Sequence, residues 1–347
     1  MGQLSALFIG GTGTISSACV TVALDRGIEL TVLNRGRTTE RPLPRDVRKI
    51  DADIRDPGAV RAALGHREFD AVVDFVAFSP SHVDLDVELF TGRTGQYVFV
   101  SSASAYHKPV PRLPIVESTP LHNPYWGYSR AKISCEERLH SAYRDRGFPI
   151  TIVRPSHTYD RISVPVLGGW TALERARRGL PVVVHGDGTS LWVLTHHLDL
   201  ARAFVALLGL PQAVGSTVHI TSDEVLTWNQ IVTTLARAAG INPHLVHLTS
   251  EQIAHAAPEW GPGLLGDKAH SVIFDNTEIR RLVPGWVASI PWVQGAREIL
   301  AWFDADPARR TIDAGTAATL DDLVALATPD APPAATATAP APAPAPA

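Results

Sequence analysis

The fold follows from the segment Ala6-Leu7-Phe8-Ile9-Gly10-Gly11-Thr12-Gly13-Thr14-Ile15-Ser16, which joins an apolar run to a glycine turn. The run predicts a buried β-strand, and residues 17–26 predict a helix, so the glycines lie in a strand-to-helix turn. Gly10 permits the tight bend, and Gly13 lets the backbone approach a diphosphate bound by the helix N-terminus. We therefore expect a dinucleotide site that includes Gly10, Gly13, Thr14 and Ile15.

Apolar, β-branched runs recur through the N-terminal half and alternate with amphipathic stretches. The runs cover residues 6–9, 30–33, 71–75, 97–100 and 150–153. This alternation predicts βαβ units, in which right-handed crossovers place helices on both faces of a parallel sheet. The fold class is therefore α/β, with a Rossmann-type doubly wound parallel sheet.

The rhythm ends after Arg154, which indicates a change of domain. We expect a dinucleotide-binding domain over residues 1–160, with contributions from about residues 190–215, and a smaller substrate-binding domain over residues 161–325. Within the second domain, Asp187-Gly188 predicts a hairpin over residues 181–194. Residues 326–347 are almost wholly Ala, Pro and Thr, so they predict a disordered tail.

Composition favours a small-molecule partner. The chain has 347 residues and a formal net charge of -4, and it lacks a long run of Lys or Arg, which argues against nucleic acid and anionic membranes as partners. Two cysteines in expected helices suit a reducing compartment better than a disulfide framework. With no apolar stretch long enough to cross a bilayer, we expect a cytoplasmic protein.

The end of the second expected strand bears on the choice of cofactor. An acid usually binds the ribose 2′-hydroxyl about 20 residues after the glycines, but this chain has Asn34-Arg35-Gly36-Arg37. Guanidinium groups at Arg35 and Arg37 favour a 2′-phosphate or stack on adenine, while Asn34 suits an unmodified ribose. Both NAD and NADP therefore stay open. Asp53 and Ile54 are expected to border the adenine.

A catalytic constellation is predicted from three residues. Ser102 ends the expected strand at residues 96–102, at the edge of the sheet where ligands bind in open α/β folds. Tyr128 and Lys132 are four residues apart and share one face of an expected helix. An ammonium beside a phenol stabilises the phenolate, which makes Tyr128 a proton carrier, and Ser102 would bind the reacting oxygen.

Together these motifs resemble the extended short-chain dehydrogenase/reductase family, in its NAD-dependent epimerase/dehydratase branch. The resemblance spans about residues 4–303 and includes the glycine turn, Asp53-Ile54, residues 101–106, residues 128–132 with Glu136, and residues 154–159. It implies a Ser, Tyr and Lys triad that moves a proton while the nicotinamide carries hydride, and it implies frequent homodimers. It also places Ser101 and Lys132 against the cofactor.

Two departures from the family pattern narrow the substrate. Dehydratases carry an Asp-Glu pair after the catalytic Ser or Thr, whereas this chain has Ala103 and Ser104, so water elimination is not expected and Ser104 becomes a substrate contact. Trp192 falls where nucleotide-sugar enzymes place a diphosphate-binding Arg. We expect Trp192 to stack on a neutral or weakly charged sugar, glycoside or nucleoside.

Histidines offer further candidates. His157 is expected at the substrate crevice by the family resemblance, where it either binds a sugar hydroxyl or is a satisfied interior histidine. His196, His197 and Asp199 are not expected to bind metal, because adjacent side chains on one element point to different sides.

The leading function is epimerisation of a sugar, nucleoside or related polyol through a transient ketone, within carbohydrate metabolism. A plain NADP-dependent carbonyl reductase is the alternative enzyme, favoured by Arg35. A non-catalytic dinucleotide-binding or RNA-binding relative is the alternative from another class, against which the intact triad and the acidic charge both argue.

Overall fold

A computed structural model describes residues 3–36 and 40–327 of the chain. Its centre is a seven-stranded sheet in which all adjacent strands are parallel. In spatial order the strands are β11 (Thr217–Ile220), β6 (Ile150–Pro155), β5 (Tyr97–Val100), β4 (Ala71–Asp74), β1 (Ser5–Ile9), β2 (Glu29–Asn34) and β3 (Arg48–Asp51). The order reverses between β1 and β4, which is where open α/β sheets bind their ligands.

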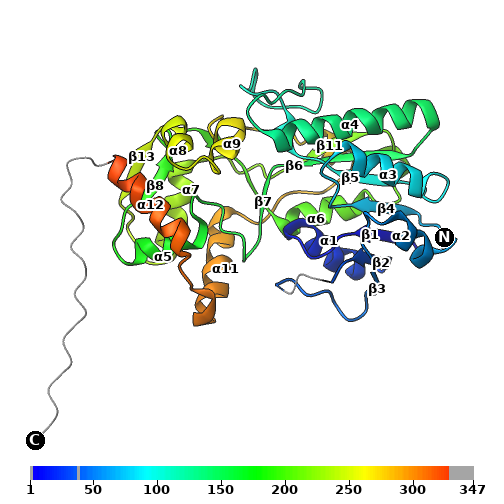
Figure 1. Cartoon of the computed structure of the whole chain (residues 1–347), viewed down its shortest axis with the longest axis horizontal. Coiled ribbons are helices and arrows are strands. Elements are labelled where there is room, and N and C mark those ends of the chain that lie inside the picture. The colour runs from blue at the N-terminus through cyan, green and yellow to red at the C-terminus, as the bar shows by residue number, and fades with distance from the viewer. Residues whose placement is uncertain (1–2, 37–39, 328–347) are drawn as a thin grey trace, which may run out of the picture.

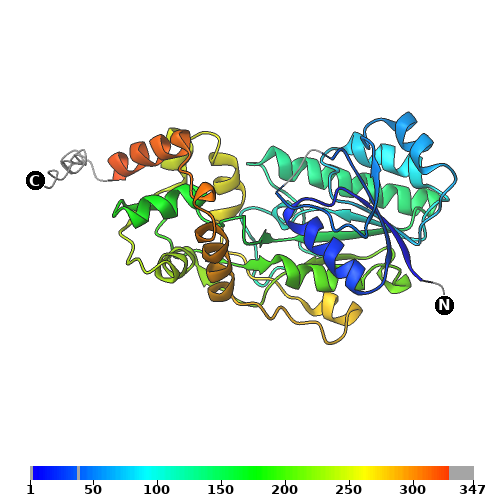
Figure 2. The same ribbon diagram turned by 90° about the horizontal axis from the view of Figure 1, so that it is seen from below.

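Helices cover both faces of this sheet, so the predicted doubly wound fold is confirmed (Figures 1 and 2). One face carries α1 (Thr14–Asp25) and α6 (His197–Ala206), and the other carries α2 (Pro57–Leu64), α3 (Pro80–Phe90) and α4 (Gly127–Arg146). Side chains alternate along a strand. Ala6 and Phe8 accordingly pack toward α1 and α6, while Leu7 and Ile9 pack toward the opposite layer.

The remaining elements form a second lobe, at the left of Figure 1. Its helices are α5 (Gly169–Arg177), α7 (Trp228–Ala238), α8 (Ser250–Ala256), α9 (Gly261–Gly263), a π-helical turn (Leu264–Lys268), α11 (Trp292–Asp304) and α12 (Ala314–Ala327). Its short strands pair as β7 (His157–Tyr159) with β10 (Leu194–His196), β8 (Val182–His185) with β13 (Leu245–Leu248), and β9 (Leu191–Trp192) with β12 (Leu226–Thr227). Helix α10 (Thr277–Leu282) instead packs against the core of the large sheet through Ile279.

The predicted hairpin over residues 181–194 is wrong. Strand β8 pairs in parallel with β13, and β9 pairs with β12. Asp187-Gly188 does form a turn, but Asn229 donates to the Asp187 carbonyl at 3.0 Å, and a Cβ on Gly188 would lie 2.1 Å from the Asn229 side chain. The turn therefore packs against the start of α7 instead of folding β9 back onto β8.

The cysteines, the helix lengths and the C-terminal residues bear on three further expectations from the sequence. Both cysteines, Cys19 and Cys135, are buried free thiols. Among residues 3–36 and 40–327, no helix has the length and apolar character needed to span a membrane. The tail expected over residues 326–347 lies outside the described residues from residue 328 onward, and its first two residues end α12.

Candidate active site

The turn between β1 and α1 fits a dinucleotide diphosphate. Gly10 and Gly11 have φ values of +94° and +151°, which disfavour residues with a Cβ. The first backbone hydrogen bond of α1 is accepted by the Gly13 carbonyl, so the N–H groups of Thr14 and Ile15 precede the helical ladder. Free amides at a helix N-terminus, together with the helix dipole, form an anion site.

A cavity of about 720 Å³ opens beside this turn. Its lining includes the residues predicted for the adenosine half of the cofactor, namely Gly10, Asn34, Arg35, Asp53 and Ile54. Asn34 Oδ1 accepts from the Gly36 amide at 3.0 Å, so its amide nitrogen is the group left to face a ribose. Arg35 is over half exposed, with Nη1 3.8 Å from Asp53 Oδ2, and is free to meet a phosphate.

Sequence reasoning missed two cations of this cavity. Lys49, from β3, and Arg55 both line it. Lys49 is bonded to Asp51 at 2.8 Å, and Arg55 donates to the Val76 carbonyl. Neither belongs to a recognisable motif, so no pattern in the sequence indicated them. Arg37, the second candidate for a 2′-phosphate, lies outside the described residues.

Replacing Arg35 by Ala should weaken NADP binding by about 10- to 100-fold, because a charge-assisted hydrogen bond contributes about 1.5–3 kcal/mol. NAD affinity should change little, since NAD lacks the 2′-phosphate. Calorimetric titration of both dinucleotides measures the difference, with Arg48→Ala, an exposed position at the start of β3, as the matched control. Equal weakening of the two would show that the guanidinium stacks on adenine and that the NADP preference is wrong.

A second cavity, of about 370 Å³, contains the predicted catalytic residues Ser102, Tyr128 and Lys132. Lys132 is 1% exposed, and its Nζ donates at 2.7 Å to the carbonyls of Ala77 and Val100. Burial lowers the pKa of Lys132 to about 8. The ammonium lies 5.8 Å from the centre of the Tyr128 ring.

The environment of Tyr128 raises the pKa of its phenol above the ordinary value. Burial raises its pKa, a hydrogen bond with Ser102 lowers it, and the charge of Asp267 raises it. The phenol is therefore protonated at neutral pH, and it becomes a base when further positive charge is bound beside it. An oxidised nicotinamide ring supplies such a charge.

Two residues expected to contact substrate or cofactor beside the triad, Ser104 and Ser101, have hydroxyls that are bonded to other protein groups. Ser104 is 3% exposed, and its Oγ lies 2.9 Å from Ser102 Oγ and 2.7 Å from Ser129 Oγ. The Ser104 hydroxyl thus forms hydrogen bonds with two other serines. We therefore assign Ser104 to the lining of the cavity and not to a direct hydrogen bond with the substrate. Ser101 borders the cavity, but its hydroxyl donates to Glu136, so the side chain faces away from the expected cofactor.

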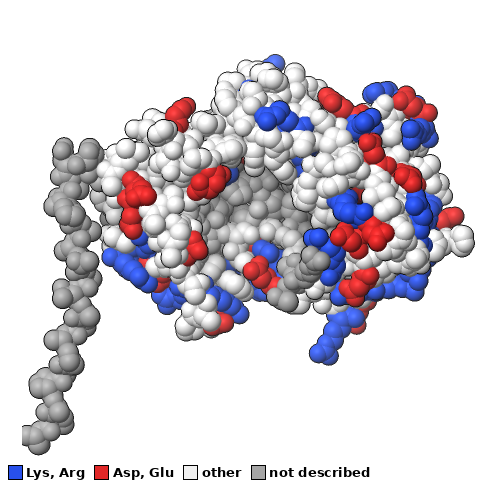
Figure 3. Space-filling view, in the orientation of Figure 1, with Lys and Arg blue, Asp and Glu red and all other residues white. Residues whose placement is uncertain are grey.

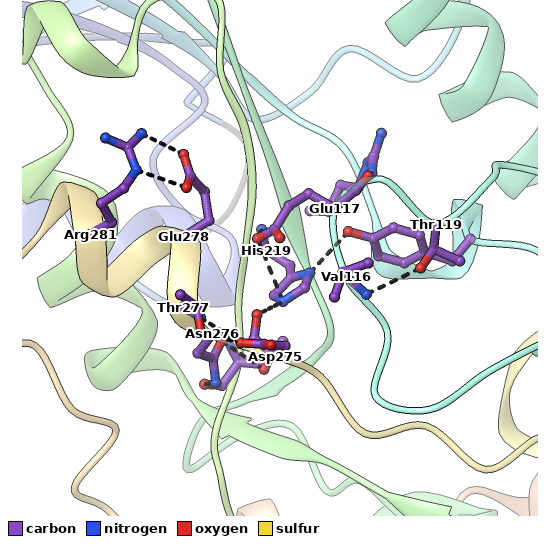
Figure 4. A network of polar contacts seen from close by, with 12 residues as sticks. Val116, Glu117, Thr119, His219, Asp275, Asn276, Thr277, Glu278 and Arg281 are labelled. Carbon is purple, nitrogen blue, oxygen red and sulfur yellow. Dashed lines mark hydrogen bonds and ion pairs between the residues drawn. The ribbon is translucent and has the colours of Figure 1, made fainter.

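Glu136 belongs to a buried polar network behind the triad. Arg154 forms an ion pair with Glu136 and donates to the Glu117 carbonyl at 3.0 Å. Next to it, His219 Nδ1 is 3.0 Å from the Tyr106 hydroxyl and its Nε2 is 2.8 Å from the Asp275 carbonyl. Figure 4 shows His219 beside Asp275. The network joins α4, β6 and β11 through Glu136, Arg154 and His219.

Trp192 is not the stacking platform that was expected. The indole borders the cavity but is 1% exposed, because Trp228 packs on it at 5.1 Å. Little of its face is free for a sugar. Its Nε1 donates to His157 Nδ1 at 3.1 Å, which places the remaining proton of a neutral His157 on Nε2.

His157 stays neutral in this setting. Burial lowers its pKa to about 3, and the charge of Lys268 adds to the effect. The ring lines the cavity, so the Nε2–H is a fixed donor for a substrate oxygen. Trp192 thereby orients His157, a candidate substrate-binding residue. The sequence had instead led us to expect that Trp192 itself contacts the substrate.

Replacing Trp192 by Phe should lower the free energy of unfolding by about 1–3 kcal/mol, because His157 Nδ1 loses its buried donor. It should also raise KM, because the freed imidazole can adopt other tautomers. Urea unfolding and steady-state kinetics measure the two effects, with Trp302→Phe as control. A rise in KM with unchanged stability would contradict the structural role and restore direct stacking.

The structure adds two cavity residues that the sequence did not suggest. Asp267 and Lys268 end the π-helical turn and line the cavity from the second lobe. The buried Lys108 ammonium lies 3.2 Å from Asp267 Oδ1, and Asn123 donates to the Gly266 carbonyl at 2.7 Å. A π turn brings these residues to a triad more than 130 positions away, so only the folded chain reveals them.

Two of the three residues around the histidine pair, His196 and Asp199, are bonded to protein groups. His196 Nε2 lies 2.9 Å from Glu298, and Asp199 accepts from the amides of Ser289 and Ile290. In the part of the chain that the structure describes, no group of three His, Cys, Asp or Glu side chains is arranged to hold a metal ion.

The strand order, glycine turn and Ser, Tyr and Lys constellation are those of an extended short-chain dehydrogenase/reductase. The comparison with family models agrees and is more specific. Residues 6–91 and 84–221 match the model described as "NAD dependent epimerase/dehydratase family". The chain belongs to this family, and its cofactor is therefore a nicotinamide dinucleotide.

Individual relatives are distant. Over 331 residues the chain is 24% identical to chloroplast stem-loop binding protein of 41 kDa b from Arabidopsis thaliana, covering 92% of this chain and 83% of the relative. It is 25% identical over 287 residues to 2'-dehydrokanamycin reductase from Streptomyces kanamyceticus, covering 82% and 80%. The solved UDP-glucose 4-epimerase of Thermotoga maritima, with UDP-glucose, superposes with a TM-score of 0.72 at 20% identity, covering 87% and 99%, which supports the fold.

Proposed function

We propose that this protein is an NAD(P)-dependent epimerase that acts on a hydroxyl-bearing carbon of a sugar, nucleoside or related polyol through a transient ketone. The observation that carries the proposal is the placement of Tyr128 together with Ser102 and Lys132 in one cavity beside the dinucleotide turn. This arrangement moves a proton to and from a hydroxyl oxygen, as oxidation and reduction at that carbon require.

The three residues of the triad have different roles in the proposed reaction. Ser102 hydrogen-bonds the reacting oxygen, and Tyr128 removes its proton in the oxidation and returns it in the reduction. Lys132 stabilises the phenolate and, by family resemblance, holds the nicotinamide ribose. The cofactor, when bound, accepts the hydride from carbon and gives it back.

Dehydration does not fit the cavity. Elimination of water needs an acid and a base beside the triad, and the positions after Ser102 are Ala103 and Ser104. The Ser104 hydroxyl is bonded to its neighbours and has no tendency to ionise at neutral pH. We therefore propose a hydride cycle without elimination.

We also propose that the substrate lacks a nucleotide diphosphate. An Arg fork binds two phosphate oxygens, whereas Trp192 has a single N–H donor, which His157 occupies. The match to 2'-dehydrokanamycin reductase supports this reading, because that relative's name gives a non-nucleotide glycoside as its substrate. A glycoside, sugar, nucleoside or polyol without a diphosphate is the substrate class that we propose, and the enzyme would act as a homodimer, as members of the family frequently do.

A net NADP-dependent carbonyl reductase is the second candidate. Arg35 favours it, because the exposed guanidinium lines the adenosine cavity where a 2′-phosphate would lie, and so does the reductase among the relatives. A reductase exchanges cofactor in each cycle, whereas an epimerase retains it.

The similarity to a stem-loop binding protein makes RNA binding a third reading, which we do not favour. RNA binding draws on a basic surface, but the net charge is -4. On the face shown in Figure 3, Lys and Arg are interspersed with Asp and Glu. The intact triad also has no use in a protein that only binds RNA.

The experiment is a screen of neutral sugars, glycosides, nucleosides and polyols, each deuterated at one candidate carbon, with nuclear magnetic resonance for the product and absorbance for the cofactor. Epimerisation should invert one carbon, retain its deuterium and leave no net reduced cofactor. Stoichiometric oxidation of NADPH would favour the reductase instead. Efficient turnover of a UDP- or dTDP-sugar would overturn the proposed substrate class.

A further inference from the structure

Three serine hydroxyls form a buried chain that ends at the triad. Ser129 Oγ donates to Ser104 Oγ at 2.7 Å, and Ser104 Oγ lies 2.9 Å from Ser102 Oγ. Ser129 and Ser104 are 0% and 3% exposed, so the chain does not reach solvent. It therefore cannot carry protons to water, and its effect must lie in how it orients Ser102.

The orientation of the Ser102 hydroxyl follows from the donors and acceptors around it. Ser104 Oγ accepts from Ser129, and either hydroxyl can be the donor in the bond between Ser104 and Ser102. The Ser104 amide also donates to Ser102 Oγ, at 3.2 Å. A hydroxyl oxygen has two lone pairs, so when Ser104 Oγ donates, its hydroxyl and its amide together fill the acceptor capacity of Ser102. Its proton then has to be donated elsewhere.

The direction left to that proton is the reacting centre, because Ser102 and Tyr128 line the same cavity. We propose that Ser104, held by Ser129, donates to Ser102, and that these two positioning residues thereby direct the one Ser102 proton to the Tyr128 oxygen before substrate binds and to the reacting oxygen afterwards. An oriented donor stabilises the developing oxyanion without reorganisation during the reaction. This inference rests on the proposed function for its catalytic meaning, but the orientation of Ser102 is a property of the folded chain.

The backbone holds the chain of serines in place. Asn123, which is 1% exposed, donates to the Ser104 carbonyl at 2.8 Å and to the Gly266 carbonyl. Ser102 also caps the short helical turn Ala103–Ala105. The backbone of Ser104 therefore stays in place when Ser129 is replaced, so a Ser129 variant removes one hydrogen bond without moving the turn.

The test measures the ionisation of Tyr128 and does not depend on knowing the substrate. The chain is labelled with ¹³Cζ-tyrosine, saturated with NAD⁺, and titrated with pH, the Tyr128 resonance being assigned with Tyr128→Phe. Ser129→Ala and Ser104→Ala should each raise the pKa of Tyr128 by about half a unit to one unit, since a hydrogen bond contributes about 0.5–1.5 kcal/mol and one unit is 1.36 kcal/mol. Lys132 and Asp267, the charges beside Tyr128, are unchanged in both variants.

Two further variants make the result decisive. Ser104→Thr keeps the hydroxyl and should retain the wild-type pKa, and Ser141→Ala removes an outer hydroxyl of the same helix, bonded to Asp145 at 2.8 Å, without effect. With a substrate from the screen, kcat should fall about 10-fold in Ser129→Ala with KM little changed. An unshifted Tyr128 in both alanine variants would overturn the proposal. Absence of turnover in the wild type with a shifted Tyr128 would instead reject the proposed function alone.

Discussion

Tyr128→Phe should lower kcat by about 10²- to 10⁴-fold, the contribution typical of a positioned acid or base, and leave cofactor affinity almost unchanged. The substitution removes the phenolic proton carrier but keeps the ring that packs against Trp126 at 5.0 Å. The phenol makes no expected contact with a phosphate or ribose. Single-turnover absorbance at the nicotinamide band and a dinucleotide titration measure the two quantities on one preparation.

Lys132→Ala is the informative comparison for this prediction. Lys132 holds the carbonyls of Ala77 and Val100 and is expected to contact the nicotinamide ribose, so its loss should impair both turnover and cofactor binding. If Tyr128→Phe weakens cofactor binding as much as Lys132→Ala does, the division of roles between phenol and ammonium is wrong.

Much of the sheet could be predicted because its central strands are buried on both faces. Such strands read as apolar runs, as at β4 and β5. Strand β3 is more exposed and contains Arg48 and Lys49, so its apolar pattern is weak. Strand β11 was not predicted either, because β7 to β10 separate it in the chain from its sheet neighbour β6. The paired strand of β8 could not be inferred either, because β13 is more than 55 residues away.

The candidate site divides in the same way. The glycine turn and the Tyr128 to Lys132 spacing are local patterns that a single stretch of sequence displays. Ser101 and Trp192 line the cavity, but their polar atoms are bonded to Glu136 and His157. The orientation of a side chain depends on partners that are distant in sequence, and neither periodicity nor a motif contains that information.

The buried ion pair of Glu136 and Arg154 gives the largest expected effect on stability. Glu136 is 1% and Arg154 4% exposed, and Arg154 Nε donates to both carboxylate oxygens, at 3.0 and 3.2 Å. Glu136→Gln keeps the volume but leaves the guanidinium without a counter-charge, which should cost about 3–5 kcal/mol in the free energy of unfolding. Denaturant unfolding, followed by circular dichroism, measures the loss.

A double variant separates the lost charge from lost packing. Glu136→Gln with Arg154→Met removes the unpaired charge together with its partner, so it should recover part of the stability, because apolar side chains can replace a buried pair at little cost. The exposed pair of Glu278 and Arg281, at 2.7 Å and also visible in Figure 4, is the control, and Glu278→Gln should cost at most about 1 kcal/mol. A double variant less stable than Glu136→Gln would show that Arg154 contributes mainly through the Glu117 carbonyl and the Tyr106 ring, which its guanidinium approaches to 4.8 Å.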